Sequence, residues 1–566
     1  LLPFVGRIYT LSYLNDGEVS DLIDLLQKHN SLGYLTGKSR QEQIDALSEK
    51  TGRELLVALY EATAGKNLAD IVMDEYKNIP NEEAQRIYLT ICIFHRIGTY
   101  ARAGNISRLH DVNFSYFQQN LFKPLESVVY NKRDYRINDY VFISRHPYIA
   151  EMVFEQVLVD EEDRFNKYIE ILTHLDTDYE SDRLVFNDIT NARKLMEIFK
   201  VNNNIRTLFK IARNNAGDNP FLLQQESIFE MRANDGNFSK SEDLLDLATD
   251  IDPDNIYFQH TKAELTLKKA EKTDNDIIRK QFIKKTKEIS SDIIQSFKNK
   301  NINISSTYHT LLKTYILELS YMLKNNESSV IDKKIQDFEK TFNIAVQEYP
   351  EEAFLLDAES KFNELLADYP GALDSLEKAF SINEGSPYVA TRLSNYYLKT
   401  DQQKSKEILE KSLKINQYDK NLNFLYSKVL INLFPEDYIN HRHYLRNSFI
   451  KNDKRYEAQF WYARCLYLVN EKEEATQFFN IIKNAPVDYR TKKNNRGMVV
   501  FDGAGKIFDG VVIKLERSYG FVKENITGET IYFYRNRNLD DRITINKNIT
   551  FNKMFNYYGV NATILL

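Results

Sequence analysis

Cysteine is almost absent from this chain of 566 residues, which contains only Cys92 and Cys465. Two thiols so far apart in the sequence provide neither a disulfide framework nor a cysteine metal site, which fits a reducing cytoplasm. Glycine (19 residues) and proline (11 residues) are also scarce. No apolar run reaches the roughly 18 residues that a membrane span needs. We therefore expect a cytoplasmic protein without membrane contact, built largely from uninterrupted helices.

Motifs for catalysis are missing as well. The sequence contains no Gly-x-Ser-x-Gly turn, no His-Glu-x-x-His run and no cysteine–histidine nucleophile pattern. His441 and His443 offer two imidazoles without a third ligand at a useful spacing, so we expect a pair of surface histidines and no metal site. These observations predict that this chain alone is not catalytic.

A repeated pattern occupies the second half of the chain. Residues 372–383 (ALDSLEKAFSIN) return 33 residues later as residues 405–416 (SKEILEKSLKIN). This spacing is close to the roughly 34 residues of a tetratricopeptide unit, which the pattern resembles. Weaker copies lie at residues 244–253, 338–345 and 473–479. Such helix pairs bury their apolar faces only by stacking, so we expect a solenoid sensor at residues 206–489 whose concave surface binds protein.

The first two hundred residues show helical spacing that is interrupted by one hairpin. Residues 127–130 (SVVY) and 140–143 (YVFI) are apolar runs on either side of the polar residues 131–134 (NKRD), which is typical of a β-hairpin or wing. A wing that follows several helices predicts a helical domain at residues 1–125 and a winged-helix-like domain at residues 126–205.

Three segments of this region resemble STAND-class P-loop ATPases, a signal-transduction group that includes bacterial antiviral ATPases. They are residues 54–63 (ELLVALYEAT), 74–76 (DEY) and 144–151 (SRHPYIAE). In that family a winged-helix histidine contacts the β-phosphate of ADP, and the resemblance places His146, preceded by Arg145, at this position. Pro147 suits the first position of a helix, whose N-terminal end attracts anions. Alternatively, His146 only caps the helix and Arg145 is solvated.

No phosphate-binding loop accompanies His146. Residues 33–39 (GYLTGKS) have three residues between the glycines, whereas a Walker A loop has four and follows a strand. Residues 74–75 follow no apolar strand and are predicted to be a solvated helical pair. The resemblance therefore implies that ATP or ADP binds to a phosphate loop and Mg²⁺ site upstream of Leu1, together with an effector domain.

Residues 497–566 resemble a cold-shock domain, a small β-barrel of the OB type. The segments 517–522 (RSYGFV) and 530–534 (TIYFY) carry the resemblance. Because alternate residues of a strand share a face, Val522, Ile531 and Phe533 are expected to fill the barrel. The same alternation places four rings on one solvated face, those of Tyr519, Phe521, Tyr532 and Tyr534.

A face of exposed rings suits unpaired bases, because each base stacked on a ring contributes roughly 1–3 kcal/mol with little dependence on its identity. We therefore expect weak binding of single-stranded nucleic acid, with Lys514 and Arg517 as further candidate contacts. Arg490, Lys492, Lys493 and Arg496 add positive charge just upstream of the barrel. The alternative is a barrel that docks on protein.

The sequence thus predicts a mainly α fold with a helical and winged-helix domain, a tetratricopeptide-like solenoid and a small C-terminal β-barrel. The predicted function is that of the switch and sensor portion of a STAND-type NTPase of bacterial antiviral defence. A viral (phage) protein would bind the repeats, and ATP would then support homo-oligomerisation that activates the upstream effector. The alternative is a non-enzymatic repeat scaffold that binds single-stranded RNA through the barrel.

Overall fold

A computed structural model describes residues 16–29, 31–32, 35–48, 68–117, 121–297, 300, 302–325, 330–417, 419–449, 453–535 and 543–565. The chain divides into two compact units, Leu1–Ala367 (unit 1) and Asp368–Leu566 (unit 2). The described residues are mainly helical, as predicted, and none of their helices has the length and apolar character required to cross a bilayer. Residues 54–63, which contribute to the resemblance to STAND ATPases, lie outside the described residues.

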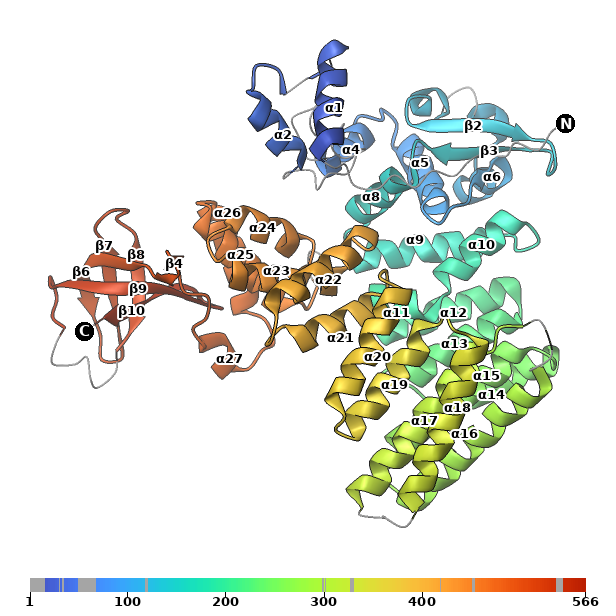
Figure 1. Ribbon diagram of the computed structural model, residues 1–566. Helices are drawn as coiled ribbons and strands as arrows, with labels where there is room; N and C mark the ends of the chain where they lie inside the picture. Colours follow the sequence, from blue (N-terminus) through green and yellow to red (C-terminus); the bar gives the residue numbers. More distant parts are fainter. Residues whose placement is uncertain are drawn as a thin grey trace. The chain divides into compact units, whose positions relative to one another are not determined.

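Unit 1 begins with several helices and a small sheet (Figure 1). The helices are α1 (Asp16–Lys28), α2 (Arg40–Ser48), α4 (Leu68–Lys77), α5 (Glu82–His95), α6 (Ala103–His110), α7 (Phe114–Tyr116), the 3₁₀ helix η3 (Lys123–Leu125) and α8 (Pro147–Val157). The sheet has the order β1-β3-β2 and contains β1 (Ala101–Arg102), β2 (Val129–Asp134) and β3 (Asp139–Ser144). The predicted hairpin is confirmed, because β2 and β3 pair along their whole length, but residues 131–134 belong to β2 and the turn lies at residues 135–138. Since β1 pairs with β3, the sheet draws residues from both sides of the boundary expected between residues 125 and 126.

Helix α5 forms the centre of the core in this region. Asn81 caps the helix, and its Oδ1 accepts a hydrogen bond of 2.8 Å from Glu83 N. Every residue from Ile87 to Phe94 is buried, as is typical of a helix that is apolar on all sides. Phe142 of β3 and Ile149 in the first turn of α8 belong to the same hydrophobic core. The end of β3 and the start of α8 are therefore held in place by packing.

The rest of unit 1 consists of successive helices, of which α12 to α18 lie side by side in Figure 1. They are α9 (Glu161–His174), α10 (Glu180–Ile189), α11 (Ala192–Ile198), α12 (Asn202–Ala216), α13 (Pro220–Arg232), α14 (Phe238–Ile251), α15 (Ile256–Lys272), α16 (Asp276–Phe297), α17 (Ser305–Lys324), α18 (Ile331–Glu348) and α19 (Ala353–Leu365). Neighbours in the sequence pack as helix pairs, for example α13 with α14 and α15 with α16. Two of the weaker repeat copies fall on α14 and α18.

Unit 2 continues with the helices that contain the clearest repeat. They are α20 (Tyr369–Ile382), α21 (Pro387–Tyr397), α22 (Gln402–Ile415), α23 (Lys420–Leu433), α24 (Tyr438–Arg446), α25 (Tyr456–Leu468), α26 (Lys472–Lys483) and α27 (Tyr489–Lys493). Asp368 caps α20 and Asp401 caps α22, each through its side chain to a backbone N–H three residues later. Leu376 and Leu409, at equivalent places, are fully buried. Caps and buried positions thus recur together, which confirms the tetratricopeptide-like helical repeat.

The C-terminal strands form a closed barrel with the order β10-β8-β7-β6-β9. The strands are β6 (Ile507–Leu515), β7 (Tyr519–Glu524), β8 (Thr530–Tyr534), β9 (Asn548–Asn556) and β10 (Gly559–Leu565), preceded by the short strands β4 (Val500–Phe501) and β5 (Ala504–Gly505). β8 and β10 are parallel, and the other pairs are antiparallel. Val522, Ile531 and Phe533 are fully buried, as their alternation predicted. Gly520 permits this packing, because a Cβ there would lie 2.4 Å from Cζ of Phe533.

The barrel packs on the last pair of long helices in unit 2. Phe555 of β9 is fully buried, and its ring centre lies 5.3 Å from that of Tyr467 in α25 and 6.4 Å from that of Phe479 in α26. Arg464 of α25 donates to the carbonyl oxygens of Gly497 at 2.8 Å and Met498 at 3.1 Å. The barrel has its own core around Phe533, and a second hydrophobic cluster that contains Phe555 and Tyr557 is shared with the end of the repeats.

Candidate functional site

His146 lies at the junction of the hairpin and α8. It is the N-cap residue of this helix, and its Nδ1 accepts a hydrogen bond of 3.2 Å from Tyr148 N. Because Nδ1 acts as the acceptor, the neutral imidazole carries its proton on Nε2, where it remains a donor. The side chain is exposed. Because the side chain of His146 is exposed and its Nε2 carries the proton, this N–H group can donate a hydrogen bond to a phosphate oxygen.

Hydrogen bonds from neighbouring residues hold the backbone of His146 in place. Ser144 Oγ lies 2.7 Å from His95 Nδ1 and donates to the carbonyl oxygen of His146 at 3.1 Å. Burial, together with the nearby His146, lowers the pKa of His95 below its usual value, so this ring is neutral at physiological pH. Arg145 forms an ion pair with Glu75 of α4. The structure thus brings Arg145 and His146 together, with the charge of Arg145 paired inside unit 1.

Ser39, the last residue of the segment 33–39 (GYLTGKS), lies at the start of a helix. Ser39 donates from its backbone N and its Oγ to Glu42 Oε2, both at 2.8 Å, at the start of α2. Gly33, the first glycine of that segment, lies outside the described residues. Asp74 and Glu75 belong to α4, as predicted for a helical pair.

The four predicted rings lie together on the barrel. Tyr519 pairs with Tyr534 and Phe521 with Tyr532 across β7 and β8. The ring of Tyr519 stacks on that of Tyr532 at 5.7 Å, and both Tyr519 and Tyr532 contact Phe521, with ring centres 5.8 and 6.0 Å apart. Burial raises the pKa of Tyr532, so its hydroxyl stays neutral and does not repel phosphate. These strands therefore present a compact, uncharged aromatic face.

The charged candidates differ in their surroundings. Lys514 of β6 pairs with Phe521 across β6 and β7, and its Nζ lies 3.2 Å from Glu516 Oε1. Arg517 is exposed in the turn between β6 and β7. Few basic side chains thus lie near the rings on the barrel itself. The electrostatic attraction that this surface exerts on a polyanion is therefore weak.

Sequence reasoning missed one part of this surface, the short helix α27. Lys493 Nζ lies 4.6 Å from the ring centre of Tyr489 and 5.9 Å from that of Tyr534. The run of basic residues before the barrel was the only signal in the sequence, because nothing there shows that Lys493 lies near Tyr534 of β8.

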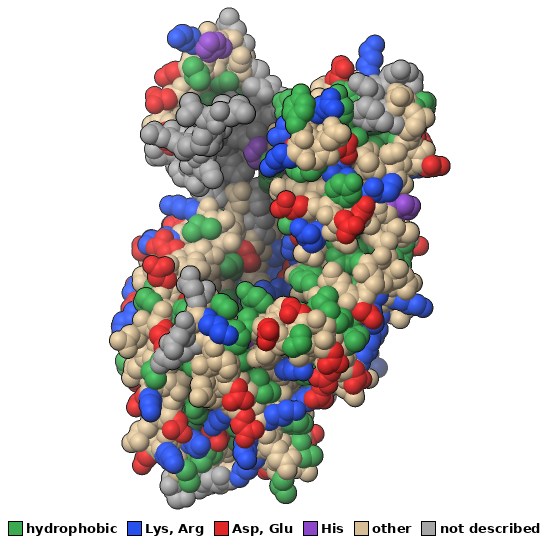
Figure 2. Space-filling model, turned by 90° about the vertical axis from the view of Figure 1, so that its right-hand side faces the viewer, with side chains coloured by type: hydrophobic (Ala, Val, Ile, Leu, Met, Phe, Trp, Pro, Cys, Tyr) green, Lys and Arg blue, Asp and Glu red, His purple; other side chains and the backbone are tan. Residues whose placement is uncertain are grey.

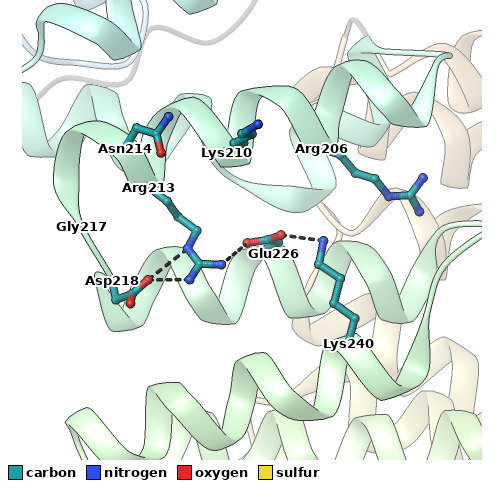
Figure 3. Close-up of a pocket in the computed structure, with 8 residues that line it drawn as sticks. All are labelled: Arg206, Lys210, Arg213, Asn214, Gly217, Asp218, Glu226 and Lys240. Carbon is teal, nitrogen blue, oxygen red and sulfur yellow. Dashed lines mark hydrogen bonds and ion pairs between the residues drawn. The ribbon is translucent and has the colours of Figure 1, made fainter.

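A pocket of about 600 Å³ lies between α12, α13 and α14 of unit 1 (Figure 3). Arg213 contacts Asp218 at 2.6 Å, and Lys240 contacts the buried Glu226 at 2.8 Å. Arg206 pairs in turn with Glu230 at 3.0 Å. These cations neutralise carboxylates of α13 and of the turn between α12 and α13, so the pocket is a network of ion pairs that ties three helices together.

The face drawn in Figure 2 also mixes basic and acidic side chains over the helices, without a continuous basic track. Ion pairs between neighbouring helices, such as Lys287 with Glu318 and Lys269 with Glu242, likewise combine basic with acidic side chains. Such a surface is typical of solvated helices and not of a nucleic-acid groove.

The prediction of surface histidines in α24 is wrong for His441, which is fully buried. Burial lowers its pKa, so the ring is a neutral core residue that packs near Tyr438, with ring centres 6.1 Å apart. The residues of one helical turn point to different sides of the helix, and packing against neighbouring elements decides which side is buried. Within the described ranges, no three His, Cys, Asp or Glu side chains are placed to hold a metal ion.

No family model and no curated protein matches this sequence. Solved structures are similar at low identity. A STAND protein with a tetratricopeptide repeat sensor from Pyrococcus horikoshii is 15% identical, with 85% of this chain and 74% of that chain covered and a TM-score of 0.31. A tetratricopeptide-repeat protein from Thermus thermophilus is 15% identical, with 37% of this chain and 99% of that chain covered and a TM-score of 0.28. One from Parabacteroides merdae is 13% identical, covering 47% of this chain and 93% of its own length, with a TM-score of 0.25.

Proposed function

We propose that this chain is the switch and sensor portion of a STAND-type ATPase of bacterial antiviral defence. The observation that carries the proposal is the exposed His146, held at the N-terminus of α8 directly after β3. Its free N–H donor fits the β-phosphate of ADP. Pro147 has no N–H, and the N–H of Tyr148 already binds Nδ1 of His146, so the imidazole is the principal donor that this end of the helix offers. Arg145, already paired with Glu75, supplies less charge.

In the proposed mechanism, ADP and His146 favour a closed monomer. A viral protein binds the repeats more tightly in the open form and shifts the population toward it. ATP then supports homo-oligomerisation, which activates an effector in the intact cytosolic protein. This chain contributes the histidine contact and the repeat surface, and the phosphate loop and Mg²⁺ site are expected in the intact protein.

Two substitutions of His146 separate phosphate binding from helix capping. We expect both His146→Ala and His146→Asn to weaken ADP binding and raise activity without a trigger, because each removes the Nε2–H donor. Asparagine is a good N-cap, so His146→Asn keeps the start of α8 intact. Calorimetric titration of the intact protein with ADP measures the effect. Normal ADP affinity in His146→Asn would assign His146 to capping alone.

A second function is favoured by the aromatic face. We infer that the barrel is of the OB or cold-shock type and binds single-stranded nucleic acid, as part of the sensor or of a non-enzymatic scaffold. In OB folds the surface of the second and third strands takes up oligonucleotides, and the four rings lie on β7 and β8, the second and third strands of this barrel.

Binding is best measured on the full chain, because a fragment beginning at residue 490 lacks the helices that share a core with the barrel. We expect weak binding of labelled oligo(U) and oligo(dT) in fluorescence anisotropy at low salt. Phe521→Ala should weaken binding about 5- to 150-fold, the equivalent of one lost stack. If the folded chain binds neither oligonucleotide, the aromatic face docks on protein and this second function fails.

A further inference from the structure

Helix α27 is fixed between the repeats and the barrel of unit 2. Lys492 Nζ donates to the carbonyl oxygen of Lys483 at the end of α26, at 2.8 Å. On the barrel side, Tyr557 N donates to the carbonyl oxygen of Lys492 at 3.1 Å. Arg496 Nη2 donates to Thr491 O at 2.6 Å, and the backbones of Arg496 and Phe555 pair as a β-bridge. The short helix therefore has a set position beside the barrel.

This position brings an additional ring and an additional cation to the edge of the aromatic face. Tyr489 and Lys493 are one helical turn apart and lie on the same side of α27. Lys493 lies between two rings, because its Nζ is 4.6 Å from the centre of Tyr489 and 5.9 Å from that of Tyr534. Tyr489 is 63% exposed and Tyr534 is 61% exposed. Two exposed rings with an exposed ammonium group between them leave large apolar areas in water.

We propose that α27 is part of the nucleic-acid site, where Tyr489 stacks on one base, Tyr534 stacks on another, and Lys493 contacts the phosphate that links them. This inference rests on the proposed binding of single strands by the barrel. Charge complementarity selects the ligand: the ammonium group suits a phosphate, and the neutral rings suit bases. The strand then runs from Phe521 across Tyr519 and Tyr532 to α27, so the site extends beyond the barrel.

The extension predicts how affinity depends on length and salt. A strand long enough to reach α27 gains one further stack, so affinity rises with length beyond the barrel's own site. Lys493 is expected to neutralise one phosphate. Replacement of Lys493 by a neutral residue therefore reduces the magnitude of the slope of log affinity against log salt by about 0.7. Binding also links α27 to the barrel through the ligand, in addition to the hydrogen bond from Tyr557 N to Lys492 O.

The experiment uses the full chain with oligo(U) and oligo(dT) of increasing length, which separates RNA from DNA, and measures anisotropy at several salt concentrations. Tyr489→Ala is expected to bind the longer oligonucleotides about 5- to 150-fold more weakly, and Tyr489→Phe is expected to restore the affinity of the unaltered chain. Lys493→Gln is expected to reduce the salt slope. Tyr257→Ala and Lys333→Gln, which change exposed residues on α15 and α18, serve as matched controls.

The outcomes distinguish this inference from the function on which it rests. If the unaltered chain binds, Phe521→Ala weakens binding, and the α27 variants bind normally at every length, the site is confined to the barrel and the inference is overturned. If the unaltered chain binds neither oligonucleotide, the nucleic-acid function itself fails, and the inference fails with it. Equal losses in Tyr489→Ala and Tyr257→Ala would also overturn the inference, because they would show no special role for α27.

Discussion

Neighbouring aromatic residues of β8 lie on opposite faces of the strand. Phe533 is fully buried under Gly520, whereas Tyr532 faces solvent beside Tyr519. We expect Phe533→Ala to destabilise the barrel by roughly 3–5 kcal/mol, because it opens a cavity in a small core. Tyr532→Ala should leave the fold intact and weaken only ligand binding. Hydrogen exchange of β7 and β8 in the full chain measures the difference, and equal protection in the two variants would contradict it.

The direction of these side chains was predictable from the sequence, because a strand has a period of two residues and the two faces alternate. The environment of single histidines was not. His146 was expected near the start of a helix because proline follows it, and the structure makes it the N-cap. His441 was placed wrongly, since burial depends on which side of α24 its neighbours cover.

At the scale of elements, the contact between α5 and α6 depends on a neutral histidine. His110 Nε2 lies 3.0 Å from Thr90 Oγ1, and the ring is almost fully buried. Burial, with a smaller effect of Lys167, lowers the pKa of His110 to about 3. In the unfolded chain the pKa is about 6.5. The contribution of neutral His110 to the free energy of unfolding is therefore fully present above pH 6.5. It is lost as the pH falls toward 3, because the unfolded chain binds the proton in this range and the folded chain does not.

We expect the hydrogen-exchange protection of α5 and α6 to decrease between about pH 6.5 and pH 4 in the unaltered chain. In His110→Gln the decrease should be smaller, since glutamine does not titrate. The slope of protection against pH tests the prediction, with His29→Gln, an exposed histidine after α1, as the control. Equal slopes in the unaltered chain and His110→Gln would show that other groups govern the acid response.

At the scale of the whole molecule, the barrel is part of the end of unit 2. Lys553 of β9 is buried and contacts Glu524 at 2.8 Å and Glu529 at 3.4 Å, and Glu529 also contacts Lys472 of α26 at 3.2 Å. Together with the packing of Phe555, these ion pairs join the barrel to the last helix pair. Barrel and helices are therefore expected to unfold together.

Removal of residues 497–566 should expose the apolar side chains of α25 and α26 that face Phe555 and Tyr557. We expect lower hydrogen-exchange protection of both helices and increased binding of an apolar dye. The helices of unit 1 should keep their protection. Full protection of α25 and α26 in the shortened chain would contradict a shared core.

The sequence by itself determined the classes of element in this protein, because helical periodicity, the return of residues 372–383 after 33 residues and the alternation in residues 519–534 are local properties. Packing alone decided what those elements form together. Pairing of β1 with β3, burial of His441, the shared core of barrel and helices, and the approach of Lys493 to Tyr534 all join residues that are distant in the sequence or depend on their neighbours in space. Such contacts follow from how apolar faces of whole elements fit together, and no local pattern encodes that fit.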